Sequence, residues 1–172
     1  MSTLVYGLSR LMAWFGGFVL SVIALLSVVS ITGRAQSGYG FGPVPGDFEL
    51  VEAGTALAVF CFMPWAHLKR GHAMVDLFWG VYPPPVKRAL TVLADLLMLV
   101  LWALLIWRMT IAMEDYRANG ELTFILQFPV WWGYAASMPA AVIGVLVYVW
   151  RFLEDIGLAR PPEGFAYAEA VH

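Results

Sequence analysis

Four long apolar segments account for about half of this chain, and most of its charged residues lie between them or near the ends. The segments cover residues 11–33, 50–68, 89–108 and 130–151. A helix rises about 1.5 Å per residue, so roughly 20 apolar residues cross a hydrocarbon core that is about 30 Å thick. All four segments reach that length. The pattern therefore predicts an all-α, polytopic membrane protein, with four transmembrane helices in a single domain over residues 1–172.

The connection between the second and third segments, residues 69–88, is too apolar for an ordinary solvated loop. It contains hydrophobic residues such as Met74 and Phe78, and three prolines at 83–85 end the pattern. This composition is typical of a short helix that lies in the membrane interface. We take five of its residues as candidates for contact with membrane lipids or with a partner: Lys69, Arg70, His72, Asp76 and Trp79.

Basic residues are divided unequally between the two sides of the predicted bundle. The side with both termini holds seven of the ten: Arg10, Lys69, Arg70, Lys87, Arg88, Arg151 and Arg160. The other side holds Arg34, Arg108 and Arg117. Because Lys and Arg are retained on the cytoplasmic side, this asymmetry predicts that both termini are cytoplasmic. The uncharged segment 11–33 is longer than the core of a signal peptide, so we expect it to be retained as a helix.

The composition argues against an enzyme. With 61% hydrophobic and 13% charged residues, little chain is left outside the membrane for a catalytic domain. The single cysteine, Cys61, allows no internal disulfide and no thiolate metal site. His67, His72 and His172 do not fall at matching depths on facing helices, as axial haem ligation would require. No phosphate-binding loop, nucleophile elbow or zinc spacing is present. We therefore expect no cofactor and no nucleic-acid partner.

Small residues recur at four-residue spacing on the first and fourth segments. The first stripe is Ala13, Gly17 and Ser21, and the second is Ala136, Ala140 and Gly144. Small residues let helix backbones approach closely in lipid, where apolar burial does not drive helix association. The stripes fit two alternatives equally: packing within the four-helix unit, or docking onto a larger membrane protein.

Asp95 is an acid about 10 Å inside the third segment, at about 1.5 Å per residue from Arg88. Acids at such depth are costly and usually face protein or a water-filled cavity. One hypothesis is a relay for protons or sodium ions. The other, which we favour, is a buried structural pair with His67 or Lys69, because a relay needs several polar groups near the midplane.

Three short motifs carry a family resemblance. The second segment begins with GDFELVE at residues 46–52, it is followed by HLKRGHAMVDLF at residues 67–78, and PVWWGY at residues 129–134 precedes the fourth. With the length and the four segments, these motifs resemble the small membrane subunit of TRAP transporters, the DctQ-type family. The Arg-Gly-His-x-x-Val-Asp run at residues 70–76 is the most specific part, although Met74 departs from the polar or basic residue common there.

The resemblance implies one component of three. A large multi-spanning permease subunit would carry substrate and sodium, and a periplasmic substrate-binding protein would deliver the substrate. The small subunit would brace the permease in the bacterial inner membrane and offer part of the docking surface, for which Arg34, Glu49 and Glu52 are the outer-face candidates. Such transporters import organic acids, commonly carboxylates, by sodium symport. Two alternatives remain: a self-sufficient oligomeric transporter or channel using Asp95, or a membrane anchor of a redox or signalling complex.

Overall fold

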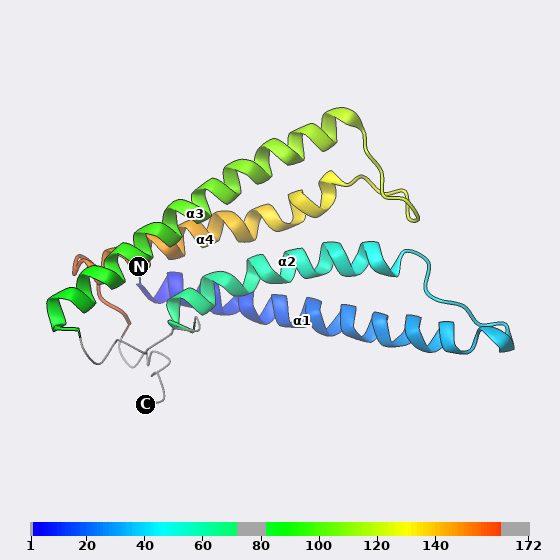
Figure 1. Ribbon diagram of the computed structural model, residues 1–172, viewed down its shortest axis with the longest axis horizontal. Coiled ribbons are helices and arrows are strands. Elements are labelled where there is room, and N and C mark those ends of the chain that lie inside the picture. Colours follow the sequence, from blue (N-terminus) through cyan, green and yellow to red (C-terminus); the bar gives the residue numbers. More distant parts are fainter. Residues whose placement is uncertain (1, 72–81, 163–172) are drawn as a thin grey trace.

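The computed structural model describes residues 2–71 and 82–162, which form four long α-helices. They are α1 (Ser2–Ala35), α2 (Asp47–Leu68), α3 (Pro84–Asn119) and α4 (Trp131–Asp155), with a short 3-10 helix η1 (Ser37–Tyr39) after α1 (Figure 1). Each long helix has the length and hydrophobicity needed to cross a membrane, which confirms the predicted all-α class and its four spanning helices. The predicted interfacial helix falls largely on residues 72–81, which lie outside the described residues.

The helices form two pairs, α1 with α2 and α3 with α4. Helix α4 also packs against α2 and, less extensively, against α1, whereas the described backbones of α2 and α3 do not come into contact. Figure 1 shows the pairs close together where α1 begins and α4 ends, and splayed apart where the connections 36–46 and 120–130 lie. We call the first the terminal end and the second the loop end.

Helices α1 and α3 are considerably longer than the apolar segments that predicted them. Helix α3 has 36 residues, which corresponds to about 54 Å, so it tilts or extends beyond a hydrocarbon core of about 30 Å. Its first turn contains Pro84 and Pro85, at positions where the missing N–H costs nothing. It ends at Gly120, which adopts a left-handed φ of 66° and donates its N–H to the carbonyl of Tyr116. Local capping, rather than hydrophobicity, therefore sets the bounds of α3.

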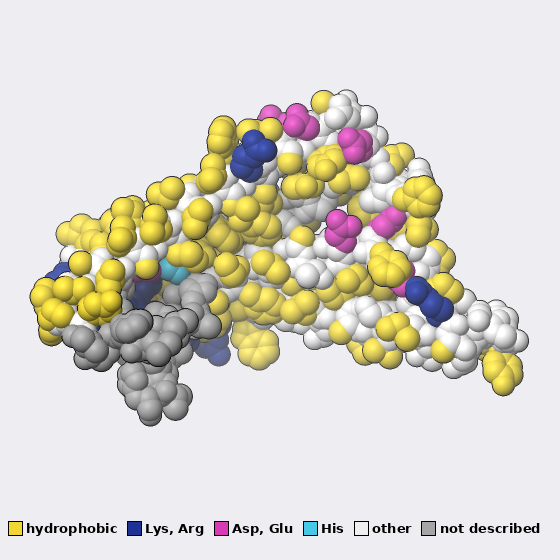
Figure 2. All heavy atoms as spheres, viewed as in Figure 1, with side chains coloured by type: hydrophobic (Ala, Val, Ile, Leu, Met, Phe, Trp, Pro, Cys, Tyr) yellow, Lys and Arg dark blue, Asp and Glu magenta, His cyan; other side chains and the backbone are white. Residues whose placement is uncertain are grey.

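The interior of the bundle is organised around α4. In its most apolar stretch 39% of the residues are buried, compared with 11% in α1 and in α3, so α4 is the central helix. One core cluster joins Tyr6, Leu68 and Val147 near the terminal end, and a second joins Met12, Cys61 and Ala140 farther along. Most other apolar side chains face outward and cover the visible faces of the helices (Figure 2). These faces suit lipid or a membrane partner rather than water.

Candidate functional site

The most heavily charged interior region of the described chain surrounds Arg151, near the end of α4. This arginine is only 1% exposed. Its guanidinium donates to Glu154 Oε2 (2.9 Å) and to Asp155 Oδ1 (3.1 Å), and its Nε lies 4.0 Å from Asp95 Oδ2 on α3. A buried charge is tolerated only when it is paired and hydrogen-bonded. Glu154 and Asp155 supply the hydrogen bonds, and Asp95 adds a third carboxylate at 4.0 Å, beyond hydrogen-bond distance.

The other two helices attach to the same acids. The hydroxyl of Tyr6 on α1 donates to both carboxylate oxygens of Glu154, at 3.0 and 2.9 Å. Trp150 also donates to Glu154, through its indole N–H at 2.8 Å. Arg70, which follows α2, donates to Asp155 Oδ1 at 2.7 Å. All four helices therefore meet in one cluster, which we call the terminal network: Tyr6, His67, Arg70, Asp95, Arg151, Glu154 and Asp155.

Arg70 reaches this network from an unusual backbone conformation. Its φ is 54°, in the left-handed region that non-glycine residues rarely adopt. The N–H of Gly71 reaches back to the carbonyl of Ala66, and the N–H of Arg70 reaches that of His67, so this residue ends α2 where glycine is usual. An arginine here costs about 1–2 kcal/mol of backbone strain, and its side chain places a cation beside Asp155.

His67 connects the terminal network to a stack of aromatic rings. Its Nε2 lies 3.5 Å from Asp95 Oδ1, and both residues are buried. The imidazole stacks on Tyr148 at 4.3 Å between ring centroids, and Tyr148 stacks on Trp102 at 4.9 Å. Trp102 in turn donates its indole N–H to the carbonyl of Ala141 at 2.9 Å. These rings fill the space between α2, α3 and α4 where the backbones of α2 and α3 stay apart.

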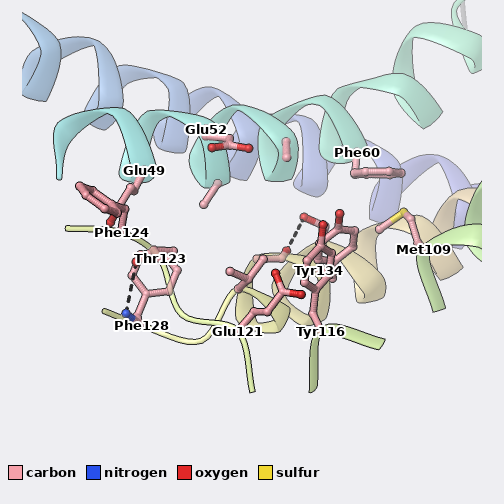
Figure 3. Close-up of a pocket in the computed structure, with 15 residues that line it drawn as sticks. Glu49, Glu52, Phe60, Met109, Tyr116, Glu121, Thr123, Phe124, Phe128 and Tyr134 are labelled. Carbon is pink, nitrogen blue, oxygen red and sulfur yellow. Dashed lines mark hydrogen bonds between the residues drawn. The ribbon is translucent and has the colours of Figure 1, made fainter. Parts of the chain in front are cut away.

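A second feature is a cavity of about 520 Å³ at the loop end, between α2 and the α3–α4 pair (Figure 3). We call it the loop-end cleft. Its walls carry aromatic and thioether side chains, and its polar groups include three carboxylates. The residues labelled in Figure 3 are Glu49, Glu52, Phe60, Met109, Tyr116, Glu121, Thr123, Phe124, Phe128 and Tyr134.

Glu49 holds the outer wall of the loop-end cleft in place. Its two carboxylate oxygens accept the backbone N–H groups of Ile125 (2.6 Å) and Leu126 (2.9 Å). On the opposite wall, the rings of Tyr116 and Tyr134 stack with their centroids 5.4 Å apart. The connection 120–130 is thus attached to α2 by a side chain, although α2 and α3 are far apart in the backbone.

A third feature is an open groove of about 740 Å³ on the outer side of the α1–α2 pair. We call it the α1–α2 groove. Its lining residues are Arg10, Ala13, Trp14, Gly17, Phe18, Ser21, Phe62 and Trp65. The groove contains the complete small-residue stripe of α1, and four of its eight lining residues are aromatic. Two indoles near its basic end, those of Trp14 and Trp65, are typical of side chains at a membrane–water interface.

The structure separates the two small-residue stripes. Ala140 and Gly144 face the interior, and a Cβ on Gly144 would lie 2.6 Å from the indole of Trp102. Gly17, in contrast, has only the tip of the Phe62 ring within 4.0 Å of a Cβ position. Helix α1 approaches α2 through the neighbouring Gly16, whose Cβ would lie 2.8 Å from that of Cys61. Two residues of the α4 stripe, Ala140 and Gly144, are therefore internal packing positions, while Ala136 is exposed. The α1 stripe is not the α1–α2 contact.

The remaining candidates lie at both ends of the bundle. Arg34 is 3.5 Å from Asp47 and its guanidinium lies over the ring of Phe48, so it faces the surface of the loop end. Lys69 lies over the ring of Trp65 at the terminal end. Three predicted interface residues fall outside the described chain: His72, Asp76 and Trp79.

The sequence did not reveal most of the terminal network. It indicated for Arg151 only a position on the side of both termini, and it pointed to no role for Glu154 or Asp155. The available signal was the spacing: both acids follow Arg151 by three and four residues, so all three share one helix face. What the sequence does not contain is the distance to Asp95 and Tyr6, which are remote in the chain.

Residues 2–71 and 82–162 contain no group of three or more His, Cys, Asp or Glu side chains placed to hold a metal ion. The molecule is a small four-helix membrane protein. Its helices are joined by ion pairs at the terminal end and are separated by the loop-end cleft at the other end. Residues 23–158 match the family model of the DctQ component of tripartite ATP-independent periplasmic transporters. The chain therefore belongs to the DctQ family, and it is a transporter component rather than an enzyme. No curated protein and no solved structure matches it.

Proposed function

We propose that this protein is the small membrane subunit of a sodium-driven transporter that imports organic acids, commonly carboxylates, with a periplasmic binding protein. It braces a large permease subunit in the bacterial inner membrane and offers part of the docking surface for the binding protein. The observation that carries this role is the terminal network in a chain of the DctQ family. Buried Arg151 and its carboxylates tie all four helices together, as a static support requires.

The position of Asp95 supports a scaffold over a self-sufficient transporter. This acid is paired with His67 and lies beside Arg151, at the terminal end of α3. Between the terminal network and the loop end, the described interior is filled by Met12, Cys61, Ala140 and the aromatic stack. Coupled ions need a succession of polar groups across the membrane, and this packing does not provide one.

The α1–α2 groove is our proposed contact with the large permease subunit. At its centre, Gly17 and Ser21 leave the α1 backbone accessible to another helix, and small residues favour such close approach. Its aromatic walls would bury large apolar area against a membrane partner. The interfacial position of the connection 69–88 stays a prediction from the sequence, in which its basic residues would adjoin anionic headgroups.

The terminal end faces the cytoplasm in this proposal and the loop end faces the periplasm. The support is the excess of basic residues at the terminal end, which remains after buried Arg151 is left out. Single cysteines introduced as Gly38→Cys and Arg160→Cys, in a Cys61→Ala background, test it in spheroplasts. An impermeant maleimide added outside should label position 38 and not position 160; the reverse result would invert the topology.

Reconstitution tests the function itself. The chain, the large permease subunit and the binding protein are combined in proteoliposomes, singly and together, with an organic acid that stabilises the binding protein against heat. Uptake should require all three components and an inward sodium gradient. Uptake by this chain alone would overturn the proposal in favour of a self-sufficient transporter. Full uptake without this chain would remove the supporting role.

A further inference from the structure

The loop-end cleft combines apolar walls with carboxylates that form no ion pair with a described residue. Glu49 is occupied by two backbone N–H groups, whereas Glu52 and Glu121 form no ion pair with any described residue. None of the described residues that line the cleft is Lys or Arg. Figure 3 shows both acids at the cleft, Glu52 from α2 and Glu121 from the connection after α3.

This chemistry favours one kind of occupant. A phospholipid headgroup would bring its phosphate among three carboxylates, and like charges repel. A lysine or arginine side chain instead carries an aliphatic stem, which packs along aromatic walls such as Phe60 and Tyr134, and a cationic tip that reaches carboxylates. The aromatic faces add cation–π attraction for the same group.

The surface around the cleft points to a protein that approaches from the loop end. Phe124 beside the cleft is 92% exposed, and three further aromatic side chains on the loop end are also exposed: Tyr39, Phe41 and Phe48. Acidic side chains gather around this end (Figure 2). Its nearby cations already have contacts, since Arg34 pairs with Asp47 and Arg117 lies over the ring of Trp131. Exposed apolar residues beside unpaired acids are complementary to a basic surface with apolar neighbours.

We propose that the loop-end cleft receives a lysine or arginine side chain of the periplasmic binding protein, with Glu52 and Glu121 as its partners. This inference rests on the proposed function and specifies the chemistry of its docking step. Glu49 acts as a positioning residue, because its hydrogen bonds to Ile125 and Leu126 keep the outer wall beside α2.

The test measures binding of the soluble binding protein to the complex of this chain with the large permease subunit in nanodiscs, over a series of KCl concentrations. The double variant Glu52→Gln and Glu121→Gln removes both charges and keeps the shape. The matched control, Glu114→Gln with Asp115→Asn, removes two charges from exposed positions of α3 outside the cleft. We expect the cleft variant to raise the dissociation constant about tenfold and to weaken its salt dependence. Because solvent and salt screen exposed charges, the dissociation constant of the control variant should stay within about twofold of the wild-type value.

Two further variants test the shape and the charge of the cleft separately. Ala56→Trp fills the cleft without changing any charge and should also weaken binding. Glu121→Lys should abolish it, and a charge reversal at one basic residue of the binding protein should restore it. Folding of each variant is checked by circular dichroism and size-exclusion chromatography.

The proposal is overturned if wild-type complex binds and the cleft variant binds equally well, or if the control variant loses as much affinity. It is also overturned if Ala56→Trp displaces phospholipid from the purified complex while affinity is unchanged, since the occupant is then a lipid. If wild-type complex does not bind the binding protein at all, the docking role in the proposed function fails together with this inference. If the wild-type complex binds and only the cleft proposal fails, the docking role in the proposed function is unaffected. Failure of the cleft proposal can therefore be distinguished from failure of the docking role.

Discussion

The two ends of this bundle hold the same helices together in opposite ways. At the terminal end, four helices contribute side chains to one buried cluster around Arg151. At the loop end, the same helix pairs are separated by a cavity of about 520 Å³. They are connected there by the hydrogen bonds of the Glu49 carboxylate and by Leu126, whose side chain packs on Gly46. Carboxylates that are paired with a buried cation make a fixed structure, whereas carboxylates that form no ion pair leave a surface available for recognition.

Removing the central cation of the terminal network should have the largest effect on stability. Arg151→Ala leaves Asp95, Glu154 and Asp155 close together without their shared partner. Loss of one partner from a buried ion cluster costs about 3–5 kcal/mol, so thermal unfolding in detergent should shift to markedly lower temperature. Arg160→Ala, at an exposed position, is the control and should leave unfolding unchanged. Equal stability of both variants would show that the terminal network does not hold the helices together.

The two stripe glycines should respond differently to the same substitution. Gly144→Leu forces a side chain into the indole of Trp102, and overpacking of this kind costs about 1–3 kcal/mol. Gly17→Leu projects into the α1–α2 groove and should leave the unfolding temperature of the isolated chain unchanged, while it reduces co-purification with the large permease subunit. If Gly17→Leu left co-purification intact, the groove would not be the docking face.

A smaller effect is expected at Arg70, where strain and ion pairing oppose each other. Arg70→Ala loses the contact with Asp155 and keeps the left-handed backbone, whereas Arg70→Gly loses the contact and relieves the strain. Because Arg70 is partly exposed, its ion pair contributes no more than about 1 kcal/mol. In urea titrations the glycine variant should therefore be more stable than the alanine variant. The opposite order would mean that the left-handed backbone costs nothing at this position.

The smallest change in global stability is expected at the loop end. Glu49→Gln replaces a carboxylate that accepts two backbone N–H groups with an amide that has one acceptor oxygen. Hydrogen exchange at Ile125 and Leu126 should accelerate, with protection around Val147 unchanged. Faster exchange at both ends would contradict the independence of the two regions.

Periodicity and length were sufficient to predict the helices but not their full extent. Hydrophobic segments marked where the chain crosses lipid, because the thickness of the bilayer fixes the length of an apolar helix. They did not mark where α3 ends, since residues 109–119 continue the helix with charged residues until Gly120. Helix capping is a local property, yet it acts beyond the span that hydrophobicity detects.

Some features of the candidate sites could be predicted from the sequence, and others required the structure. The sequence identified Asp95 as a costly acid and proposed His67 as a partner, and the structure places them 3.5 Å apart. It offered no means of choosing between the two stripes, because both have the same spacing. Only the position of Trp102 against Gly144, and of Gly16 against Cys61, separates internal packing from an open groove.

The sequence by itself determined that this is a four-helix membrane protein and, through its motifs, that it resembles the DctQ family. These properties depend on composition and local order, which a chain carries without folding. The tertiary structure alone decided that Arg151 is buried among carboxylates from two helices and that Glu52 and Glu121 share one cleft. Electrostatic interactions depend on distance and on exclusion of solvent, and both are set only when segments remote in the chain pack together.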